Sequence, residues 1–401
     1  MATHSLRLNA TGWIGLGAMG HPMALNLFTK TYIAHQQGAS SGNSIRFFIC
    51  EQDDSKADAF VRELKARGGM DLADRVMRVG SGREMALAAS RIFTMLPSTP
   101  QVETVYLDPS HGILAGLRQL PKDTLALTPR SSRTVDSLNE AEGVEKECIV
   151  PTSPDSSPST ASSSTVVPHT LLVDQTTLDP TVSLQVSSVI HQETSRKALM
   201  LDAPVSGGTV AAQKGDLTIM FGSPSDTATL LATPLLQRMA RVNGVIECGK
   251  SAAGVGVKVC NNLVLACNQI ALAEGLALGQ SLGIDPSLLT GVINSSSGSS
   301  WSSRTNPPVK EIPNTPASRD YSGGFQTRLM LKDVSLALSA AHKHDLPTPL
   351  TWASQSIYES VCQEGDGSWA GKDFSVVYEW IQKKQREGVE TGWKGDTGAN
   401  L

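Results

Sequence analysis

The chain has 401 residues, a formal net charge of −4 and a hydrophobic content of 40%. A chain of this length is expected to form two or three domains, and this composition supplies enough apolar residues for their cores. The slightly acidic balance and the lack of any basic run give no indication of a nucleic-acid partner. The six cysteines are scattered without a C-x-x-C pair, which is typical of free thiols in a reducing compartment.

The first ten residues, MATHSLRLNA, contain one arginine, two hydroxyl residues and no acid. This composition is similar to that of a mitochondrial presequence, although the segment is shorter than a typical one. A mitochondrial and a cytoplasmic location therefore both stay open.

The first predicted strand leads into a glycine-rich motif. An apolar run that ends at Trp13 and Ile14 is followed by G-x-G-x-x-G at Gly15, Gly17 and Gly20, and then by a predicted helix. In such a motif the first glycine permits a tight turn, the second lets the backbone approach a pyrophosphate, and the third lets helix and strand pack closely. The N–H groups at the start of the helix favour phosphate binding, so this context predicts a dinucleotide site.

The second predicted strand ends in acidic residues. The run IRFFIC at residues 45–50 is followed by Glu51, our first candidate to accept the two ribose hydroxyls, and by Asp53, our second. An acid at this position repels a 2′-phosphate, which favours NAD over NADP. The spacing from the glycine motif is longer than usual, and an ordinary solvated acid after a strand is the alternative.

Five further apolar runs predict strands of the same sheet, at residues 91–97, 171–177, 199–203, 215–222 and 244–249. The third of these runs lies in LMLDAPVSGG, which continues into Ser206, Gly207 and Gly208. Small residues after a strand can present several backbone N–H groups to an anion.

A polar segment at about residues 123–168 interrupts this pattern. Between residues 151 and 168, fourteen of eighteen residues are Ser, Thr or Pro, a composition that cannot bury enough apolar surface to fold. We expect a disordered surface insertion. Regulation by phosphorylation is an alternative to an insertion that is merely tolerated.

Residues 254–283 form the longest predicted helix, thirty residues without a proline. Its apolar residues occupy nearly every face, which predicts a helix buried on all sides and shared between two halves of the protein. Its polar residues are too many for a membrane span, so no membrane partner is expected.

Lys258 and Asn262 lie four residues apart in this helix and therefore on one face. Lysine is seldom fully buried without a partner, and burial would lower its pKa and suit it to acid–base chemistry. The alternative is a lysine that extends to solvent from the end of a helix.

The remaining chain is predicted to be helical. We expect an α/β Rossmann-type domain at residues 10–250, an all-α domain at residues 251–385 joined to it by the long buried helix, and a flexible tail at residues 386–401. Four tryptophans are expected to fill the helical core: Trp301, Trp352, Trp369 and Trp380. His342 and His344 lack a carboxylate at ligand spacing, so no metal site is expected.

Four motifs occur in an order that resembles one family: GLGAMGHPMALNL, DAPVSGG, GVGVKVCNN and FQTRLMLKD. The chain is similar to the 3-hydroxyisobutyrate dehydrogenases of the β-hydroxyacid dehydrogenase family, from about residue 12 to residue 381 apart from the insertion. The stretches NSSSGSSWSS and KDFSVVYEW favour this family member over its relatives that act on glyoxylate, tartronate semialdehyde or phosphogluconate.

The resemblance implies roles for individual residues. Lys258 matches the catalytic lysine, Asn262 matches the asparagine that orients it, and Ser206, Gly207 and Gly208 match the loop that holds the substrate carboxylate. Lys332 matches a lysine at the junction of cofactor and substrate. Further implied cofactor contacts are Met19, Leu96, Pro97 and Thr177.

The implied activity is NAD-dependent oxidation of 3-hydroxyisobutyrate to methylmalonate semialdehyde, a step of valine breakdown, by a mitochondrial homo-oligomer. Two alternatives stay open. The chain could act on another short 3-hydroxy acid, because the loop recognises a carboxylate better than a methyl branch. It could also be a dinucleotide-binding module without activity.

Overall fold

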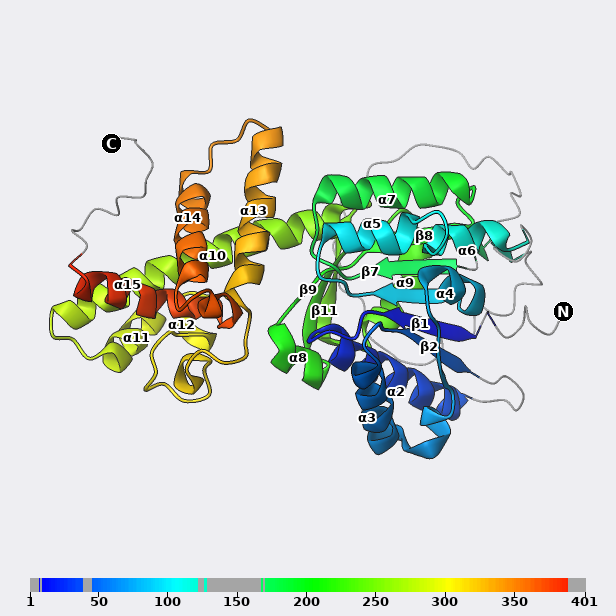
Figure 1. The fold of residues 1–401 in the computed structure, drawn as a ribbon, viewed down its shortest axis with the longest axis horizontal. Helices are drawn as coiled ribbons and strands as arrows, with labels where there is room; N and C mark the ends of the chain where they lie inside the picture. The colour runs from blue at the N-terminus through cyan, green and yellow to red at the C-terminus, as the bar shows by residue number, and fades with distance from the viewer. Residues whose placement is uncertain are drawn as a thin grey trace, which may run out of the picture.

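The computed structural model describes residues 7, 9–38, 45–121, 126–127, 167–168 and 170–388. It consists of a sheet covered by helices and a group of helices beside it, and the long helix α10 (Ala253–Ser281) runs from one into the other (Figure 1). This is the predicted fold class, an α/β Rossmann-type part followed by an all-α part.

The sheet has the strand order β11-β10-β8-β7-β4-β1-β2-β3, with β9 paired to β10 beside this path. All pairs are parallel except those that join β10 to β8 and to β9. The predicted strands are present, whereas the short strands β3 and β9 were not predicted. The bounds are β1 (Ala10–Ile14), β2 (Arg46–Cys50), β3 (Val76–Arg78), β4 (Arg91–Thr94), β7 (Thr170–Asp174), β8 (Ala198–Asp202), β9 (Val205–Ser206), β10 (Leu217–Gly222) and β11 (Ala240–Gly249).

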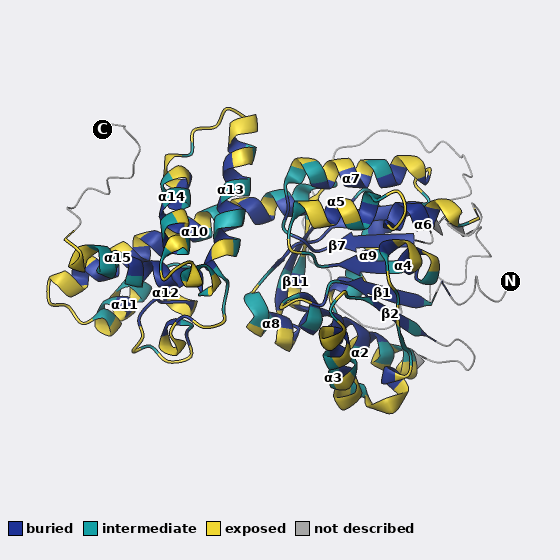
Figure 2. Cartoon of the chain, in the orientation of Figure 1, coloured by how far each residue is buried: buried dark blue, intermediate teal, exposed yellow. Residues whose placement is uncertain are grey.

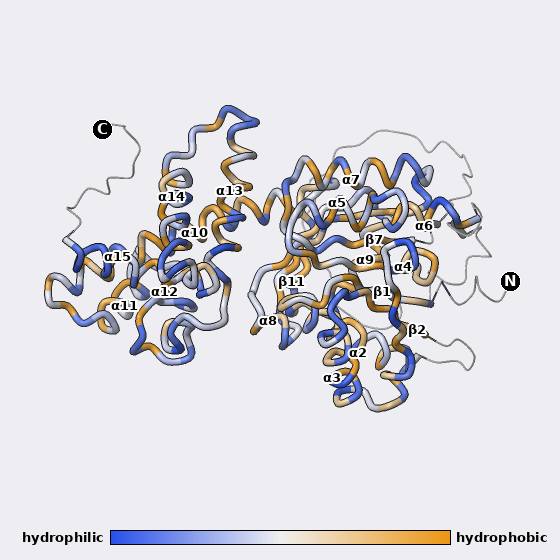
Figure 3. The backbone as a smooth tube through the Cα atoms, in the orientation of Figure 1, coloured by the Kyte–Doolittle hydropathy of each residue, from blue (hydrophilic) through white to orange (hydrophobic). Residues whose placement is uncertain are grey.

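Helices cover both faces of the sheet, because alternate side chains of each strand point to opposite faces. Leu171 and Val173 of β7 belong to one hydrophobic cluster with α2, α3 and α9, and Leu172 belongs to another with α4 to α7. Burial on both faces explains the unbroken apolar run at residues 171–173 in the middle of β7, and Figure 3 shows hydrophobic colour within the sheet. The helices are α2 (Gly20–Gly38), α3 (Asp54–Ala73), α4 (Gly82–Ala88), α5 (Thr99–Leu107), α6 (Ile113–Gln119), α7 (Pro180–Glu193), α8 (Gly208–Lys214) and α9 (Asp226–Leu236).

Most of the predicted insertion, residues 123–168, lies outside the described residues, as does the tail from residue 389. Its described ends form a two-stranded antiparallel ladder of β5 (Ala126–Leu127) and β6 (Val167–Pro168), in which Leu127 faces Val167. The prediction of a disordered loop is therefore wrong for these four residues, which pair through their backbones.

The helical part packs around the second half of α10. Leu276 and other residues of α10 share a third hydrophobic cluster with Val334, Tyr358 and Phe374. The helices are α11 (Pro286–Ser295), α12 (Trp301–Thr305), α13 (Thr327–Lys343), α14 (Pro349–Gln363) and α15 (Val377–Arg386), with short 3₁₀ turns η3 (Ala317–Arg319), η4 (Ser368–Gly371) and η5 (Phe374–Val376).

Helix α10 is not buried on all sides, contrary to the prediction. Val257, Val264, Leu278 and Leu282 form an exposed apolar stripe along one face, and Figure 2 shows exposed and buried faces alternating along the helix. By length and composition alone α10 could cross a membrane, but a core helix passes the same test and α10 packs against α13, α14 and α15.

The prediction for the tryptophans is wrong in two cases. Trp301 and Trp352 are about half exposed, whereas Trp380 is buried. The large aromatic side chains that are fully buried in the helical part are those of Tyr321, Tyr358 and Phe374. Composition alone could not show which aromatic residues the helix packing turns inward.

Candidate active site

The glycine motif forms a turn between β1 and α2 that is closed towards the protein and open towards solvent. Gly15 has a φ of +94°, and a Cβ added to it would lie 2.4 Å from the carbonyl oxygen of Met95. A Cβ on Gly20 would lie 2.0 Å from the carbonyl oxygen of Gly15, whereas Gly17 is exposed with nothing within 4 Å. Met19 packs against the core beneath the turn. The open side at Gly17 leaves room for a pyrophosphate beside the start of α2.

Glu51 follows β2 and lies against this turn. Its Oε2 accepts the Leu16 N–H at 2.7 Å, and its Oε1 accepts the Asp53 N–H at 3.2 Å. A carboxylate has about four acceptor sites, so two ribose hydroxyls can still bind. The carboxylate is thus tied to the glycine turn and is not an ordinary solvated acid.

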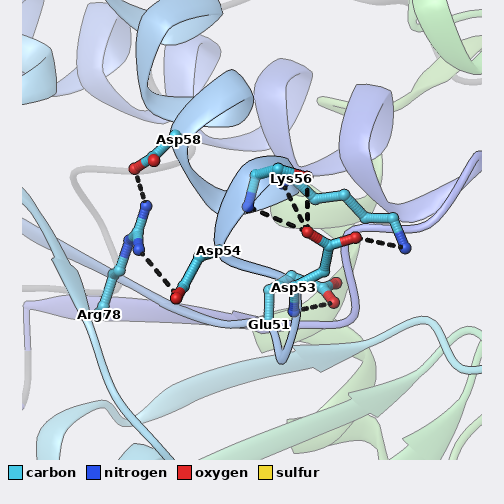
Figure 4. A network of polar contacts seen from close by, with 7 residues as sticks. Glu51, Asp53, Asp54, Lys56, Asp58 and Arg78 are labelled. Carbon is cyan, nitrogen blue, oxygen red and sulfur yellow. Dashed lines mark hydrogen bonds and ion pairs between the residues drawn. The ribbon is translucent and has the colours of Figure 1, made fainter.

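The acidic residues beyond Glu51 have structural partners (Figure 4). Asp53, our second candidate for the ribose, caps α3 by accepting the Ser55 N–H at 3.0 Å. Arg78 on the neighbouring strand β3 is paired with both Asp54 and Asp58. This arginine is therefore already neutralised by two carboxylates.

Two loops at the carboxyl ends of β4 and β7 are joined by hydrogen bonds. The buried carboxylate of Asp174 accepts the Thr94 hydroxyl at 2.8 Å and the Thr176 N–H at 3.2 Å, and burial raises its pKa to about 6. Thr176 in turn accepts the Leu96 N–H on its hydroxyl oxygen at 3.0 Å. This arrangement fixes the predicted cofactor contacts, residues 96–97 and Thr177, at one edge of the sheet.

The loop after β8 has an unusual backbone. Gly207 and Gly208 have φ values of +133° and +68°, a region that L side chains rarely adopt. A Cβ on Gly207 would lie 2.6 Å from that of Ala211, whereas Gly208 has open space beside it. Ser206 is half-buried in β9, and the loop presents its backbone at the surface.

Lys258 lies in the second turn of α10, and its side chain is turned inward. The residue is 7% exposed, and its Nζ donates a hydrogen bond to Asn262 Oδ1 at 2.9 Å. The alternative of a lysine that extends to solvent is therefore wrong. Burial lowers the pKa of Lys258 to about 8; the charge of Asp333 opposes this shift and that of Lys332 adds to it.

Asn262 connects Lys258 to helix α13. Its Nδ2 donates to Asp333 Oδ2 at 2.5 Å, and its Oδ1 also accepts the side-chain amide of Asn261 at 3.0 Å. The buried Asp333 thus fixes the orientation of the Asn262 amide, so that the oxygen faces Lys258. Our sequence reasoning did not select Asp333; its position directly after Lys332 was the available signal.

Lys332 joins α13 to the β7 loop. Its Nζ donates to the Thr177 carbonyl oxygen at 2.8 Å and lies 3.3 Å from Asp333 Oδ1, an ion pair without hydrogen-bond geometry. A continuous chain of contacts therefore runs from Thr177 to Lys258. No hydrogen bond in the described part of the chain joins this group to the Ser206–Gly208 loop or to the glycine turn.

Within the described ranges, no group of three or more His, Cys, Asp and Glu residues could hold a metal ion. The group joined by the contacts from Thr177 to Lys258 contains a buried lysine with a lowered pKa, next to the loops at the carboxyl ends of β4 and β7.

The chain matches two sequence families in succession. Residues 10–127 and 152–253 match "NAD binding domain of 6-phosphogluconate dehydrogenase". Residues 252–381 match "NAD-binding of NADP-dependent 3-hydroxyisobutyrate dehydrogenase".

Individual relatives have related names. The chain is 44% identical to "Probable 3-hydroxyisobutyrate dehydrogenase, mitochondrial" of Arabidopsis thaliana, over 52% of this chain and 60% of that protein. It is 33% identical to a protein of the same name from Dictyostelium discoideum, over 96% of this chain and 93% of that one. The solved structure of Mycobacterium tuberculosis 3-hydroxyisobutyrate dehydrogenase with L-serine is 29% identical, with a TM-score of 0.65, over 93% of this chain and 99% of that one.

Proposed function

Because the chain belongs to the 3-hydroxyisobutyrate dehydrogenase family and is an NAD-dependent oxidoreductase, we propose that it oxidises 3-hydroxyisobutyrate to methylmalonate semialdehyde, a step of valine breakdown. Lys258 is the general acid–base group of this reaction. The observation that carries the proposal is the buried Lys258, hydrogen-bonded to Asn262 and connected through Asp333 and Lys332 to the β7 loop.

Lys258 takes the proton of the substrate hydroxyl. With a pKa of about 8, roughly a tenth of the lysine is neutral at pH 7, against a negligible fraction of a free lysine. Asn262 Oδ1 holds the Nζ in place and satisfies one of its N–H groups, so that the lone pair of the neutral amine is directed elsewhere, towards the substrate. In the reverse reaction the same group returns the proton.

Bound NAD would supply the acceptor for the hydride of the carbinol carbon. Gly15, Gly17 and Gly20 would hold its pyrophosphate, and Glu51 its ribose. The backbone at Gly17 offers the open space that this group needs. We expect NAD to be preferred over NADP, because Glu51 repels a 2′-phosphate and Arg78 is already paired with two carboxylates.

The Ser206–Gly208 loop would bind the substrate carboxylate. Two successive residues with positive φ turn the backbone so that its N–H groups can face an anion. Lys332 supplies a positive charge at the junction between cofactor and substrate, from the face of α13 that meets the β7 loop.

A second candidate function is the oxidation of another short 3-hydroxy acid. The observation that favours it is the relative from M. tuberculosis, whose structure contains L-serine. In L-serine, as in 3-hydroxyisobutyrate, the primary alcohol is on the carbon next to the one that bears the carboxylate. The same lysine could therefore take its hydroxyl proton, and the same loop could bind its carboxylate. A dinucleotide-binding module without activity is disfavoured, because Lys258 and Asn262 are both present and hydrogen-bonded to each other.

One assay separates these functions. NAD reduction is measured with 3-hydroxyisobutyrate, L-serine, glycerate and gluconate, each with the protein and with its Lys258→Met variant. We expect the highest kcat/KM with 3-hydroxyisobutyrate and a kcat at least about a hundredfold lower for the variant. A higher kcat/KM with L-serine would favour the second function, and NAD binding without turnover of any of the four acids would favour the inactive module.

We further propose that the protein is mitochondrial and a homo-oligomer. The names of the relatives from Arabidopsis and Dictyostelium support the location, and fractionation of cells that express the full chain would test it. The exposed apolar stripe of α10 supports the assembly, because exposed apolar side chains that share one helix face can be buried against a second copy of the chain.

A further inference from the structure

Asp202 lies at the end of β8, buried beneath the first turn of α10. It is 3% exposed, and its two carboxylate oxygens accept backbone N–H groups of that turn. Oδ1 accepts the Ala252 N–H at 2.6 Å, and Oδ2 accepts the Val255 N–H at 2.8 Å. Burial raises the pKa of Asp202 to about 6 while these bonds oppose the shift, so the carboxylate is mostly ionised at pH 7.

Helix α10 has no cap within its own sequence. Its N-cap residue, Ala252, has a φ of +69° and no side chain that can accept a hydrogen bond, and the described first turn contains no acid. The first N–H groups of a helix need acceptors, and an anion there also stabilises the helix dipole. Asp202, about fifty positions earlier in the chain, provides both the hydrogen-bond acceptors and the negative charge.

The space around this carboxylate is formed by two glycines. A Cβ on Gly222 would lie 2.7 Å from Asp202 Oδ1, and a Cβ on Gly254 would lie 2.8 Å from Oδ2. The same Cβ atoms would lie 2.5 Å from the Lys250 carbonyl oxygen and 2.6 Å from that of Met220, so a larger residue at either position would have to move the carboxylate or the backbone around it. The two glycines thus allow the Asp202 carboxylate to approach the start of α10 closely.

This contact lies between two parts of the proposed site. Four residues after Asp202 the chain reaches Ser206, and three residues after Val255 it reaches Lys258, which is one helical turn further. We propose that Asp202 is a positioning residue, which fixes Lys258 relative to the loop that binds the substrate carboxylate. This inference rests on the proposed role of Lys258. A displacement of about 1 Å between reacting groups can lower a rate a hundredfold, so the position of α10 matters for turnover.

The test compares Asp202→Asn with Asp373→Asn. Asp373 is 1% exposed and also accepts two backbone N–H groups, from Phe325 at 2.7 Å and from Ser375 at 3.0 Å, but it lies in the helical part. In Asp202→Asn the amide presents an N–H where the native carboxylate accepts one, so one bond to α10 is lost. Both variants should lower the Tm by several degrees.

The kinetic results should differ between the two variants. For Asp202→Asn we expect kcat to fall at least about tenfold, while the Kd for NAD changes less than twofold and amide exchange becomes faster at residues 252–256. For Asp373→Asn we expect kcat within twofold of the native value. A native-like kcat in Asp202→Asn, or an equal loss of kcat in Asp373→Asn, would overturn the proposal.

A second variant keeps the test decisive where Asp202→Asn does not fold. Gly254→Ala retains the carboxylate, but its Cβ would lie 2.6 Å from the Met220 carbonyl oxygen and 2.8 Å from Asp202 Oδ2, so it should displace the start of α10 from both. It should give the same loss of kcat with unchanged NAD binding; a native kcat here would equally overturn the proposal. If the native protein oxidises none of the four acids, the proposed function fails. Slower exchange at residues 252–256 in the native protein than in Asp202→Asn would then still establish Asp202 as the anchor of α10.

Discussion

At the scale of the residue, Lys258 combines a charge with almost complete burial, and its hydrogen bond to Asn262 holds the Nζ in one place. We expect Lys258→Met to bind NAD normally and to lose at least about a hundredfold in kcat, because proton transfer by a positioned side chain contributes 10²–10⁴-fold. Lys258→Arg should lose nearly as much, since a guanidinium stays protonated at working pH. Near-normal turnover of the arginine variant, with unchanged NAD titration, would disprove the acid–base role.

The same burial predicts a cost in stability. The pKa of Lys258 is about 8 in the folded protein and 10.5 for a free lysine, a difference that corresponds to about 3 kcal/mol. Because the folded pKa is lowered, this cost is fully present below pH 8, where the lysine is charged in both states, and it disappears as the pH rises towards 10.5. Lys258→Met should therefore raise the free energy of unfolding at pH 7 by up to about 3 kcal/mol, and by clearly less at pH 9.5.

Equilibrium denaturation at the two pH values measures this effect, and Lys250→Met is the control. Lys250 is an exposed lysine just before α10, so its replacement should change stability by less than about 0.5 kcal/mol at either pH. If Lys258→Met lowers the free energy of unfolding at pH 7, or raises it equally at both pH values, the buried ammonium does not destabilise the folded protein.

Glu51 is the residue expected to select the cofactor. Glu51→Gln keeps an acceptor for the Leu16 N–H but removes the charge, so it should lower the ratio of kcat/KM for NAD to that for NADP by about tenfold or more. Asp71→Asn, which changes an exposed acid in the last turn of α3, should leave this ratio within twofold. Equal efficiency of the native protein with both cofactors would remove Glu51 from the selecting role.

At the scale of the element, α10 carries Lys258 inward at one end and an apolar stripe outward along its length. If that stripe is an interface between copies of the chain, Leu278→Glu should shift the protein to monomers, because it would bury an unpaired charge. Sedimentation velocity would show the shift. Leu278 is 62% exposed, and Leu230 on α9, 75% exposed, provides the matched control: Leu230→Glu should leave the assembly unchanged. A monomeric native protein at micromolar concentration would contradict the proposal.

At the scale of the whole molecule, α13 ties the helical part to the sheet at two places. Lys332 donates to the Thr177 carbonyl, and Lys343 donates to Asp179 at 2.9 Å and to Thr181 at 3.0 Å. The two lysines are eleven residues apart, about three helical turns, and so lie on one face of α13. Both contacts reach the segment that follows β7, at the end of the strand where the candidate site lies.

The insertion enters at the opposite end of β7, before Thr170. Because Leu127 and Val167 face each other across β5 and β6, residues 128–166 can be replaced by an Asn-Gly turn. We expect kcat and KM within twofold of the native values and a stability change of about 1 kcal/mol or less, since loop closure depends only logarithmically on length. Loss of activity in a folded deletion variant would mean that the insertion reaches the active site or an interface.

The sequence by itself determined the longer strands of the main sheet, the glycine turn and the spacing of Lys258 and Asn262. Each of these depends on residues close together in the chain: a buried strand reads as an apolar run, and residues four apart share a helix face whatever the helix packs against. The charge of Glu51 after the second strand was readable for the same reason. Local periodicity, however, could not show whether α10 has an exposed side, or that Trp301 and Trp352 face outward.

The tertiary structure decided how these pieces act together. Asn262 meets Asp333 across 71 residues of chain, and the start of α10 meets Asp202 across about fifty, so neither partner can be identified from spacing. The pKa of Lys258 depends on how completely the surrounding elements exclude water and on the opposing charges of Lys332 and Asp333, which only folding brings near it. The sequence thus determined which groups are present, and the packing of α10 against β8 and α13 decided their distances and charge states.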